Sequence, residues 1–300
     1  MTGAEVGAVI TALDPDESLL RVVASVVGQV GSVVVVDDGS TTAAAAEVLA
    51  ACAELGSTVL RHGRNLGIAA ALNTGVSHAL AGPRPTRAVL TLDQDSSVPE
   101  GYVRAALTAW DRAENAGVRV AMVGPERVNG RRVPIAEVRD GVPTGAEPIQ
   151  SGLLVPGAVL REVGRFDEGL FIDGVDTDFY LRCLDTGRAV VLAPGTDLEH
   201  RLGARHAVTL AGRAVTWSGA PVELTASAPF RYYYLVRNRV VLVTTRGRRH
   251  PRWALGQLVG LVGHLALVLA FVPGRAARAR WARRGLRDGV RKVSGPAPRW

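Results

Sequence analysis

Short apolar runs alternate with helix-like segments through the first half of the chain. The runs at 6–11, 33–36, 58–60, 89–92 and 120–125 have the length and β-branched content of buried strands. Four consecutive valines at 33–36 indicate a strand covered on both faces, which is typical of a parallel sheet. Helices are expected between these strands, at 19–26, 42–55, 69–79 and 100–116. This alternation predicts a doubly wound α/β domain with ligands at the carboxyl ends of its strands.

The second half of the pattern is less regular. Residues 129–147 are polar and rich in Gly, Pro and Arg, so they are expected to form an excursion or flexible loop, one that could close over a ligand. A strand is expected to return to the sheet at 150–155, followed by a helix at 177–185 and a short strand at 189–193. The helix after Gly67 carries many small residues, which would let its backbone lie close to the sheet.

Composition and charge narrow the class of protein. Apolar residues make up 47% of the 300, which is normal for a globular protein. The two cysteines, Cys52 and Cys183, have no metal-binding spacing, and we expect free, buried thiols. The first residues lack the features of a secretory signal, so a cytoplasmic protein is expected. From Arg246 onward there are 13 basic residues and one acid, whereas the rest of the chain is slightly acidic, with 22 basic and 27 acidic residues.

Two acidic clusters stand out, one after a predicted strand and one at the start of a predicted helix. Asp93 and Asp95 stand one residue apart directly after the strand at 89–92, where carboxylate oxygens could bridge a divalent cation to a diphosphate. The alternative is an ordinary solvated turn. The second cluster contains Asp173, Asp176 and Asp178, the last two at the start of the helix at 177–185. Capping by carboxylates explains that cluster equally well, and Arg182 has the spacing to pair with Asp178.

Other single residues are ambiguous by themselves. His200 follows a strand and offers an imidazole to a metal, although a structural histidine is the commoner case. Ser151 and Gly152 could offer backbone N–H groups to a phosphate, or form a plain turn. Asn65 and Gly67 suit a tight turn with polar groups facing a ligand. The chain has neither a P-loop nor a dinucleotide-binding glycine motif, which disfavours kinase-like and NAD-dependent enzymes.

Taken together, the motifs resemble the nucleotide-sugar glycosyltransferases of family 2, and more closely their bacterial rhamnosyltransferase branch. The segments that carry this resemblance stand in the family's order and cover most of residues 6–245: Val-Val-Asp-Asp-Gly-Ser at 35–40, Asn65-x-Gly67 with Asn73 and Gly75, Leu-Asp-Gln-Asp-Ser at 92–96, Ser151-Gly152, Phe-Ile-Asp-x-Val-Asp-x-Asp at 171–178, Leu198-x-His200-x-x-Gly203 and Tyr233-Tyr-x-x-Arg237-Asn238, with Gly285-Leu-x-Asp-Gly289 near the end. The resemblance implies a GT-A fold, a Rossmann-like and mostly parallel sheet flanked by helices, over residues 1–245.

The resemblance also implies roles for individual residues. Asp38 would recognise the pyrimidine base of the donor, with Asn65 and the backbone of Thr11, Ala12, Leu13 and Asp14 lining the same pocket. Asp93, with Gln94 beside it, would approach the ribose. Asp95 would hold Mg²⁺ or Mn²⁺, and His200 would complete the metal or diphosphate contacts.

Asp176 would be the general base in a single displacement that inverts the anomeric configuration. Asp178 would orient Asp176 or bind the acceptor. Asp173 is a further candidate for supporting catalysis or binding the acceptor. Many relatives carry an acid immediately before the base, where this chain has Val175, so the division of labour among the three aspartates stays open.

The acceptor side is less specific. It would be shaped by Tyr233, Arg237 and Asn238. The alternative is a structural helix, with its tyrosines packed against the domain and its arginines in solvent. Trp217 could stack on a sugar, although an isolated tryptophan more often belongs to a core or an interface.

The segment 246–300 is expected to be helical, basic and membrane-associating. Residues 253–272 are almost wholly apolar and only just long enough to span a bilayer. The basic helix that follows carries Trp281. Together they favour an anchor lying on an anionic cytoplasmic leaflet, with a spanning helix and a soluble packing helix as alternatives. No nucleic-acid-binding motif accompanies the charge, so nucleic acid is not an expected partner.

We therefore expect a metal-dependent transferase of rhamnose from dTDP-rhamnose to a cell-envelope polysaccharide or its lipid-linked precursor. One alternative is transfer of another sugar, such as galactofuranose from its UDP donor. Another is a nucleotide-binding membrane scaffold without catalysis. The sequence does not fix the donor, the acceptor linkage or the oligomeric state.

Overall fold

The computed structural model describes residues 2–82, 86–201, 205–210, 213–214, 216–217, 220–221 and 223–297. It divides into a first unit, Met1–Phe171 with Val175–Arg201, and a second unit, Ile172–Gly174 with Leu202–Trp300. This division lies well before the boundary predicted at 245. The helix that carries the Tyr233–Asn238 motif belongs to the second unit because it packs on the C-terminal helices.

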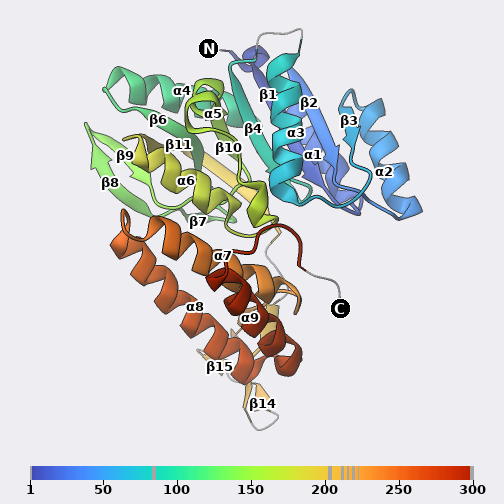
Figure 1. The fold of residues 1–300 in the computed structure, drawn as a ribbon. Helices are drawn as coiled ribbons and strands as arrows, with labels where there is room; N and C mark the ends of the chain where they lie inside the picture. The colour runs from blue at the N-terminus through green and yellow to red at the C-terminus, as the bar shows by residue number, and fades with distance from the viewer. Residues whose placement is uncertain are drawn as a thin grey trace. The chain divides into compact units, whose positions relative to one another are not determined.

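The first unit is built on a mixed sheet with the strand order β3-β2-β1-β4-β10-β6-β11-β9-β8 (Figure 1). The amino-terminal strands are parallel: β1 (Val6–Ala12), β2 (Ser32–Asp37), β3 (Thr58–Arg61) and β4 (Ala88–Asp93). The strand β10 (Leu153–Pro156) runs antiparallel to both β4 and β6 (Val120–Val128), and β11 (Ala189–His200) is again parallel to β6. The expected α/β sheet is confirmed.

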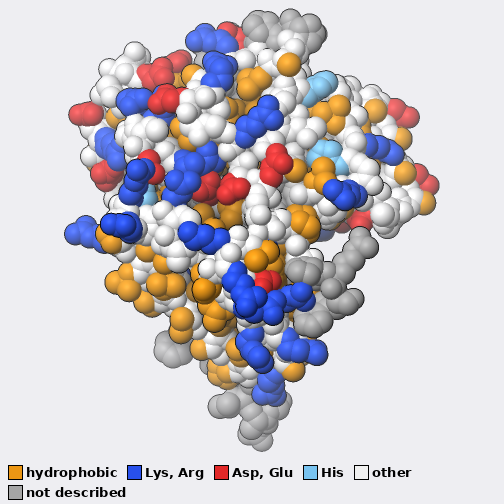
Figure 2. Space-filling view, viewed as in Figure 1, with side chains coloured by type: hydrophobic (Ala, Val, Ile, Leu, Met, Phe, Trp, Pro, Cys, Tyr) orange, Lys and Arg blue, Asp and Glu red, His pale blue; other side chains and the backbone are white. Residues whose placement is uncertain are grey.

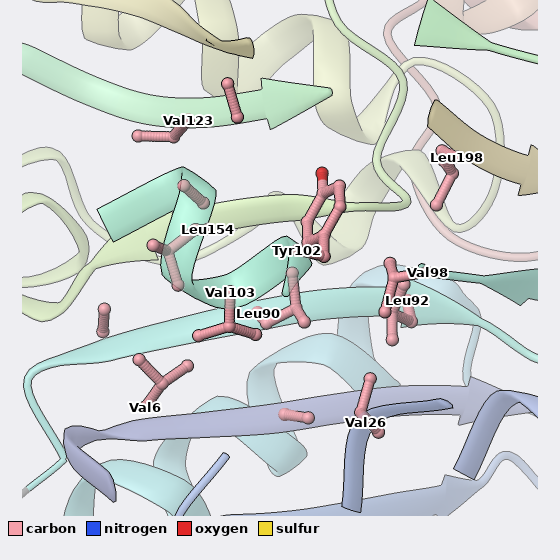
Figure 3. Close-up of a cluster of buried hydrophobic side chains, with 14 of the residues drawn as sticks. Val6, Val26, Leu90, Leu92, Val98, Tyr102, Val103, Val123, Leu154 and Leu198 are labelled. Carbon is pink, nitrogen blue, oxygen red and sulfur yellow. The ribbon is translucent and has the colours of Figure 1, made fainter. Parts of the chain in front are cut away.

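Helices cover both faces of this sheet. Its helices are α1 (Ser18–Val27), α2 (Ala43–Glu54), α3 (Ile68–Ala81), α4 (Tyr102–Asn115), α5 (Gly157–Val163) and α6 (Val175–Asp185), with 3₁₀ turns η1 (Gly3–Glu5) and η2 (Glu168–Leu170). Alternate residues of β1, β2 and β4 join α1, α2 and α4 in one apolar core, part of which is drawn in Figure 3. Both cysteines are free and buried, as predicted.

The helix α3 covers the opposite face and lies very close to the strands. A Cβ atom on Gly75 would stand 2.3 Å from Val9 Cγ1 and 3.1 Å from Val36 Cγ2, so any larger residue would push the helix away. The small residues predicted to bring this helix near the sheet do so. The strands β1 and β2 are therefore covered on both faces, as the run of valines indicated.

The segment 129–147 is not a flexible loop. It forms β7 (Arg131–Arg132), β8 (Ile135–Arg139) and β9 (Val142–Gly145), and β9 pairs with β11 at the end of the sheet. Asp140 and Gly141 both have positive φ in the turn between β8 and β9. An Asp-Gly pair is a strong hairpin signal, and the many polar residues around it concealed the strands.

Among its described residues, the second unit contains three helices and several short strands. The helices are α7 (Arg231–Arg246), α8 (Pro251–Phe271) and α9 (Arg275–Val290); the strands are β12 (Arg205–Ala207), β13 (Thr209–Leu210), β14 (Arg213–Ala214), β15 (Thr216–Trp217), β16 (Ala220–Pro221) and β17 (Glu223–Thr225). A Cβ atom on Gly285 would stand 2.3 Å from the Tyr233 carbonyl oxygen. The Gly285–Gly289 element therefore lets α9 lie against α7.

Candidate functional site

Loops at the carboxyl ends of β1, β2 and β4 are tied together by side chains. The Leu13 amide donates to Gln94 Oε1 at 2.7 Å, and the Thr41 amide donates to Asp14 Oδ1 at 2.9 Å. Asp14 itself has a φ of +44°, which an aspartate tolerates better than most residues. The residues predicted to line a donor pocket, from Thr11 to Asp14, thus lie at the edge where α/β sheets bind ligands.

Asp38 anchors the loop that follows β3. Its carboxylate accepts hydrogen bonds from the amides of Leu66 and Gly67, at 2.9 and 2.8 Å, and from His62 Nδ1 at 2.8 Å. The side chain of Asn65 accepts from the same Gly67 amide. Asp38 is 5% exposed. The structure therefore gives Asp38 a loop-holding role, and its contact with a donor base stays a prediction.

The strand β10 supports the first aspartate of the Asp93-x-Asp95 pair. The Asp93 amide donates to the Ser151 hydroxyl at 3.0 Å, and Asp93 pairs in register with Thr11 on the adjacent β1. The Gly152 amide donates to the Thr91 carbonyl oxygen. This backbone N–H group of the Ser151–Gly152 turn is therefore used in the sheet. Burial raises the pKa of Tyr102, whose hydroxyl donates to the Gly152 carbonyl oxygen.

His200 reaches the Asp93-x-Asp95 pair through a short antiparallel ladder. The strand β5 (Ser96–Ser97) pairs with the end of β11, and His200 stands opposite Ser96. The Ser96 hydroxyl lies 2.6 Å from His200 Nδ1, and Asp95 Oδ1 lies 3.7 Å from the same nitrogen. Two segments about a hundred residues apart in sequence are thereby joined at one point.

Asn129 fixes the other edge of His200. Its side-chain amide donates to the His200 carbonyl oxygen at 2.7 Å, and its Oδ1 accepts from the His200 amide at 3.0 Å. Sequence reasoning missed both Asn129 and the role of Ser96, because the pairing of β5 with β11 is not visible locally. A cavity of about 630 Å³ adjoins these residues and is also lined by Arg21 and Arg201.

The donor set fits a divalent cation. Asp93, Asp95 and His200 each offer one ligand atom, and these atoms lie within 4.8 Å of one another. All three side chains are partly exposed. Two carboxylate oxygens and one imidazole nitrogen are suitable ligands for Mn²⁺, and Mg²⁺ would favour the oxygens.

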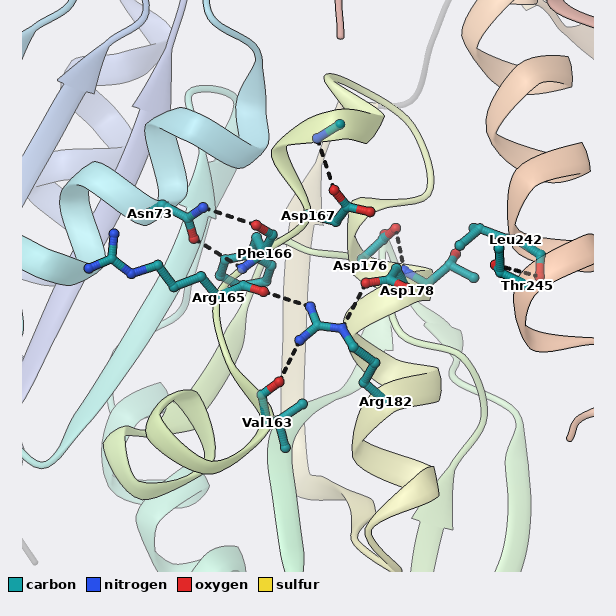
Figure 4. A network of polar contacts seen from close by, with 12 residues as sticks. Asn73, Val163, Arg165, Phe166, Asp167, Asp176, Asp178, Arg182, Leu242 and Thr245 are labelled. Carbon is teal, nitrogen blue, oxygen red and sulfur yellow. Dashed lines mark hydrogen bonds and ion pairs between the residues drawn. The ribbon is translucent and has the colours of Figure 1, made fainter. Parts of the chain in front are cut away.

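Asp176 and Asp178 have different surroundings, although both lie in the first turn of α6 (Figure 4). Asp176 is partly exposed, and its Oδ1 accepts from the Thr177 amide. Asp178 is 3% exposed and is held by Arg182 Nε at 2.8 Å, the predicted pair. Arg182 also donates to the carbonyl oxygens of Val163 and Arg165, both at 2.7 Å. Asp178 is thus a structural carboxylate within the first unit.

The remaining predicted residues lie in the second unit. Asp173 pairs with Arg231 at 2.5 Å, and its carbonyl oxygen accepts from Asn238. The side chains of Tyr233, Arg237 and Asn238 are 0, 1 and 2% exposed, so the arginine expected in solvent is buried. Arg237 lies over the rings of Tyr233 and Tyr234 and donates to Asn238 Oδ1.

In the structure, the side chains of Tyr233, Arg237 and Asn238 are buried and pack within the second unit. Their contact with an acceptor stays a prediction. Trp217 is in β15, but its side chain lies outside the described residues, as does Gly203.

Comparison with known proteins identifies the class. Residues 8–154 match the model of glycosyl transferase family 2. The chain is 28% identical over 251 residues to the dTDP-rhamnosyl transferase RfbF of Shigella flexneri, covering 78% of each protein. Residues 8–154 belong to glycosyl transferase family 2. The chain is a glycosyltransferase and is rhamnosyltransferase-like, as its motifs indicated.

Solved structures confirm the fold. Two crystal structures of S. aureus TarS, one of residues 1–349 in complex with UDP-GlcNAc, align with 96% of this chain at a TM-score of 0.54 and 16% identity. The chain covers 81% of the shorter TarS structure and about half, 49%, of the longer one. At this identity the likeness concerns the GT-A fold, and the Asp93-x-Asp95 pair lies in the family 2 segment.

Proposed function

We propose that this family 2 glycosyltransferase is metal-dependent and transfers rhamnose from dTDP-rhamnose with inversion of configuration. The observation that carries the metal is the convergence of Asp93, Asp95 and His200 within 4.8 Å. The observation that favours the donor is the likeness to a dTDP-rhamnosyl transferase over 78% of the chain. A UDP-sugar donor, such as UDP-galactofuranose, is the alternative, and a non-catalytic nucleotide-binding scaffold is the alternative of another class.

The residues of the first unit divide the chemistry between them. Asp95 and His200, with Asp93 beside them, would hold the cation, which would stabilise the charge that develops on the departing diphosphate. Asp176 takes the proton from the acceptor hydroxyl. At the same time the acceptor oxygen forms a bond to C1 of the sugar, and the bond from C1 to the diphosphate oxygen breaks. The partial exposure of Asp176 at the start of α6 suits that role better than the buried, arginine-bound Asp178.

The acceptor is proposed to be a cell-envelope polysaccharide or its lipid-linked precursor, reached at the cytoplasmic face of the membrane. The basic C-terminal segment supports this location, since 13 Lys and Arg residues stand against one acid from Arg246 onward. A lipid-linked acceptor would explain why a catalytic unit carries such a segment.

Donor choice is tested by thermal shift with dTDP, UDP, GDP and their sugars, each with and without Mn²⁺ or Mg²⁺. A ligand at about 100 times its Kd adds about 2.7 kcal/mol to the free energy of unfolding. The largest metal-dependent shift is expected with dTDP-rhamnose, and Asp95→Asn should remove the metal dependence. A larger shift with UDP-sugars would transfer the proposal to the UDP donor. Binding without turnover of any donor, even with lipid acceptor, would favour the scaffold.

A further inference from the structure

The helix α8 presents an apolar surface to solvent and keeps its polar residues inside. Between Ala254 and Val272 the polar side chains are Gln257 and His264 alone. Gln257 bonds to Arg239, and His264 stacks on Tyr232 with its Nε2 3.3 Å from the tyrosine hydroxyl. Both partners belong to α7. The polar side of the helix is therefore turned toward the rest of the second unit.

The opposite side of α8 carries exposed apolar residues and glycines. Leu255, Val259 and Val262 are 65, 65 and 66% exposed, and Leu258 and Leu267 are 40 and 46% exposed. The other exposed positions between Leu255 and Ala270 are occupied by glycine or alanine. This arrangement is the reverse of a helix on the surface of a soluble protein, where the apolar stripe faces the core.

The packing of α8 argues that it lies along a surface and does not cross it. Val268 and Val272 are buried with Tyr232 and Ala282, and Leu261 and Leu265 pack on the same cluster. One side of the helix is thus bound to α7 and α9. The helix is long and apolar enough to span a bilayer, and only 11% of its most apolar 18-residue stretch is buried in the structure.

An arginine row on α9 accompanies this apolar face. Arg280, Arg283, Arg284 and Arg287 line one concavity of about 490 Å³ and recur at helical spacing. The single acid of the helix, Asp288, is buried and bound by Arg287 and Tyr233. One acid against four arginines leaves the row with a net positive charge. In Figure 2 apolar side chains gather over α8, and Lys and Arg side chains gather over α9 on the same viewed face.

We propose that the exposed side of α8 and the arginine row of α9 form one docking surface for an anionic lipid bilayer. The helix α8 lies in the plane of the interface with Leu255, Val259 and Val262 among the acyl chains, while Arg280, Arg283 and Arg287 meet lipid phosphates. Charge favours lipid over a second copy of the chain, because a symmetric contact would bring two arginine rows together.

The test is flotation of the purified full-length chain with vesicles, without donor or acceptor. The chain should float with vesicles containing about a third phosphatidylglycerol and remain unbound with phosphatidylcholine alone. Because binding is measured without nucleotide, its outcome is independent of the proposed transferase activity. Raising the salt concentration should release the protein, since the phosphate contacts are screened. An alkaline carbonate wash should also release it.

Two sets of substitutions separate the contributions. Replacing Arg280, Arg283 and Arg287 by Gln should weaken binding to anionic vesicles about a hundredfold, at about fivefold for each basic residue. Replacing Leu255, Val259 and Val262 by Gln should also release the chain, and these exposed positions leave the packing of α8 intact. The matched control replaces three exposed arginines of the first unit, Arg104, Arg112 and Arg131, by Gln and should bind as the unaltered chain does.

Three results would overturn the proposal. The first is a folded, monomeric chain that ignores anionic vesicles. The second is a dimer in the absence of lipid that the Leu255, Val259 and Val262 substitutions dissociate, which would assign the face to a second copy. The third is resistance to the carbonate wash, which would assign α8 to a spanning helix.

Discussion

The Ser96 hydroxyl lies 2.6 Å from Nδ1 of His200, across the two-residue ladder that joins β5 to β11. Ser96 is completely buried, so this bond is shielded from solvent. A hydrogen bond at one ring nitrogen of a histidine fixes which nitrogen is left to bind a metal. If Nδ1 donates to Ser96, Nε2 is the ligand atom.

Ser96→Ala should therefore weaken Mn²⁺ binding about tenfold, the lower end of the effect of removing such an outer partner. Isothermal titration of Mn²⁺ into the purified protein measures it. Ser97→Ala is the matched control, because the hydroxyl of the neighbouring serine donates to the Glu199 carboxylate. Unchanged or tighter binding in Ser96→Ala would mean that Nδ1 is itself the ligand.

Asp176→Asn should lower kcat by at least about a hundredfold and leave the KM for the donor nearly unchanged, because a general base acts in the transition state. Initial rates over a range of donor concentrations, with saturating acceptor, separate the two parameters. Asp185→Asn, an exposed aspartate near the end of the same helix, should keep the unaltered kcat. An undiminished rate in Asp176→Asn would remove this residue from the proposed mechanism.

Arg182→Met should cost about 3 kcal/mol in the free energy of unfolding, because it leaves Asp178 as a buried carboxylate without its main cation. The side chains of the pair are 16 and 4% exposed. Urea denaturation measures the change. Arg119→Met is the matched control, since Arg119 pairs with Glu162 at 56 and 43% exposure and should contribute less than about 1 kcal/mol. Equal costs for the two variants would contradict the structural role of Asp178.

Burial raises the pKa of Cys52 to about 11 and that of Cys183 to about 12. The thiolate is the reactive form, so neither cysteine of the native protein should react with iodoacetamide at pH 8. Mass spectrometry before and after unfolding in urea should show no modification and then two modified thiols. Because folding favours the neutral thiols, their contribution to stability should be complete below about pH 9 and decline as the pH rises further. Rapid modification of the native protein would contradict this burial.

The parallel strands of the core and the position of an acidic pair at their carboxyl ends were predictable because they are encoded locally. The valines at 33–36 and the Asp93-x-Asp95 pair each lie in one short segment, and an α/β domain places the carboxyl ends of its parallel strands at one edge. The contact between Ser96 and His200 was not predictable, since it depends on the pairing of two short segments that lie about a hundred residues apart in sequence. Burial of Arg237 was missed for a similar reason, because beside its neighbours on α7 it donates to the carbonyl oxygen of Gly295, far along the chain.

Gln150 offers a test of how the turn before Ser151 is built. Its side chain is 8% exposed, and neither Oε1 nor Nε2 has a hydrogen-bond partner among the described residues. A buried amide without partners costs about 1–3 kcal/mol, and an apolar group of the same shape avoids that cost. Gln150→Met should therefore raise the free energy of unfolding by about 1 kcal/mol, measured by urea denaturation.

Gln29→Met is the control with the opposite expected sign. Gln29 Nε2 donates to the carbonyl oxygens of Ser25 and Pro99, and its Oε1 accepts from the Val103 amide. Methionine at this position leaves the two carbonyl oxygens and the amide without their hydrogen-bond partner, so the free energy of unfolding should fall by about 1 kcal/mol. A loss of stability in Gln150→Met comparable to that of Gln29→Met would mean that the Gln150 amide is satisfied in solution. Opposite signs would show that the turn before Ser151 is not optimised for stability, as expected beside a binding edge.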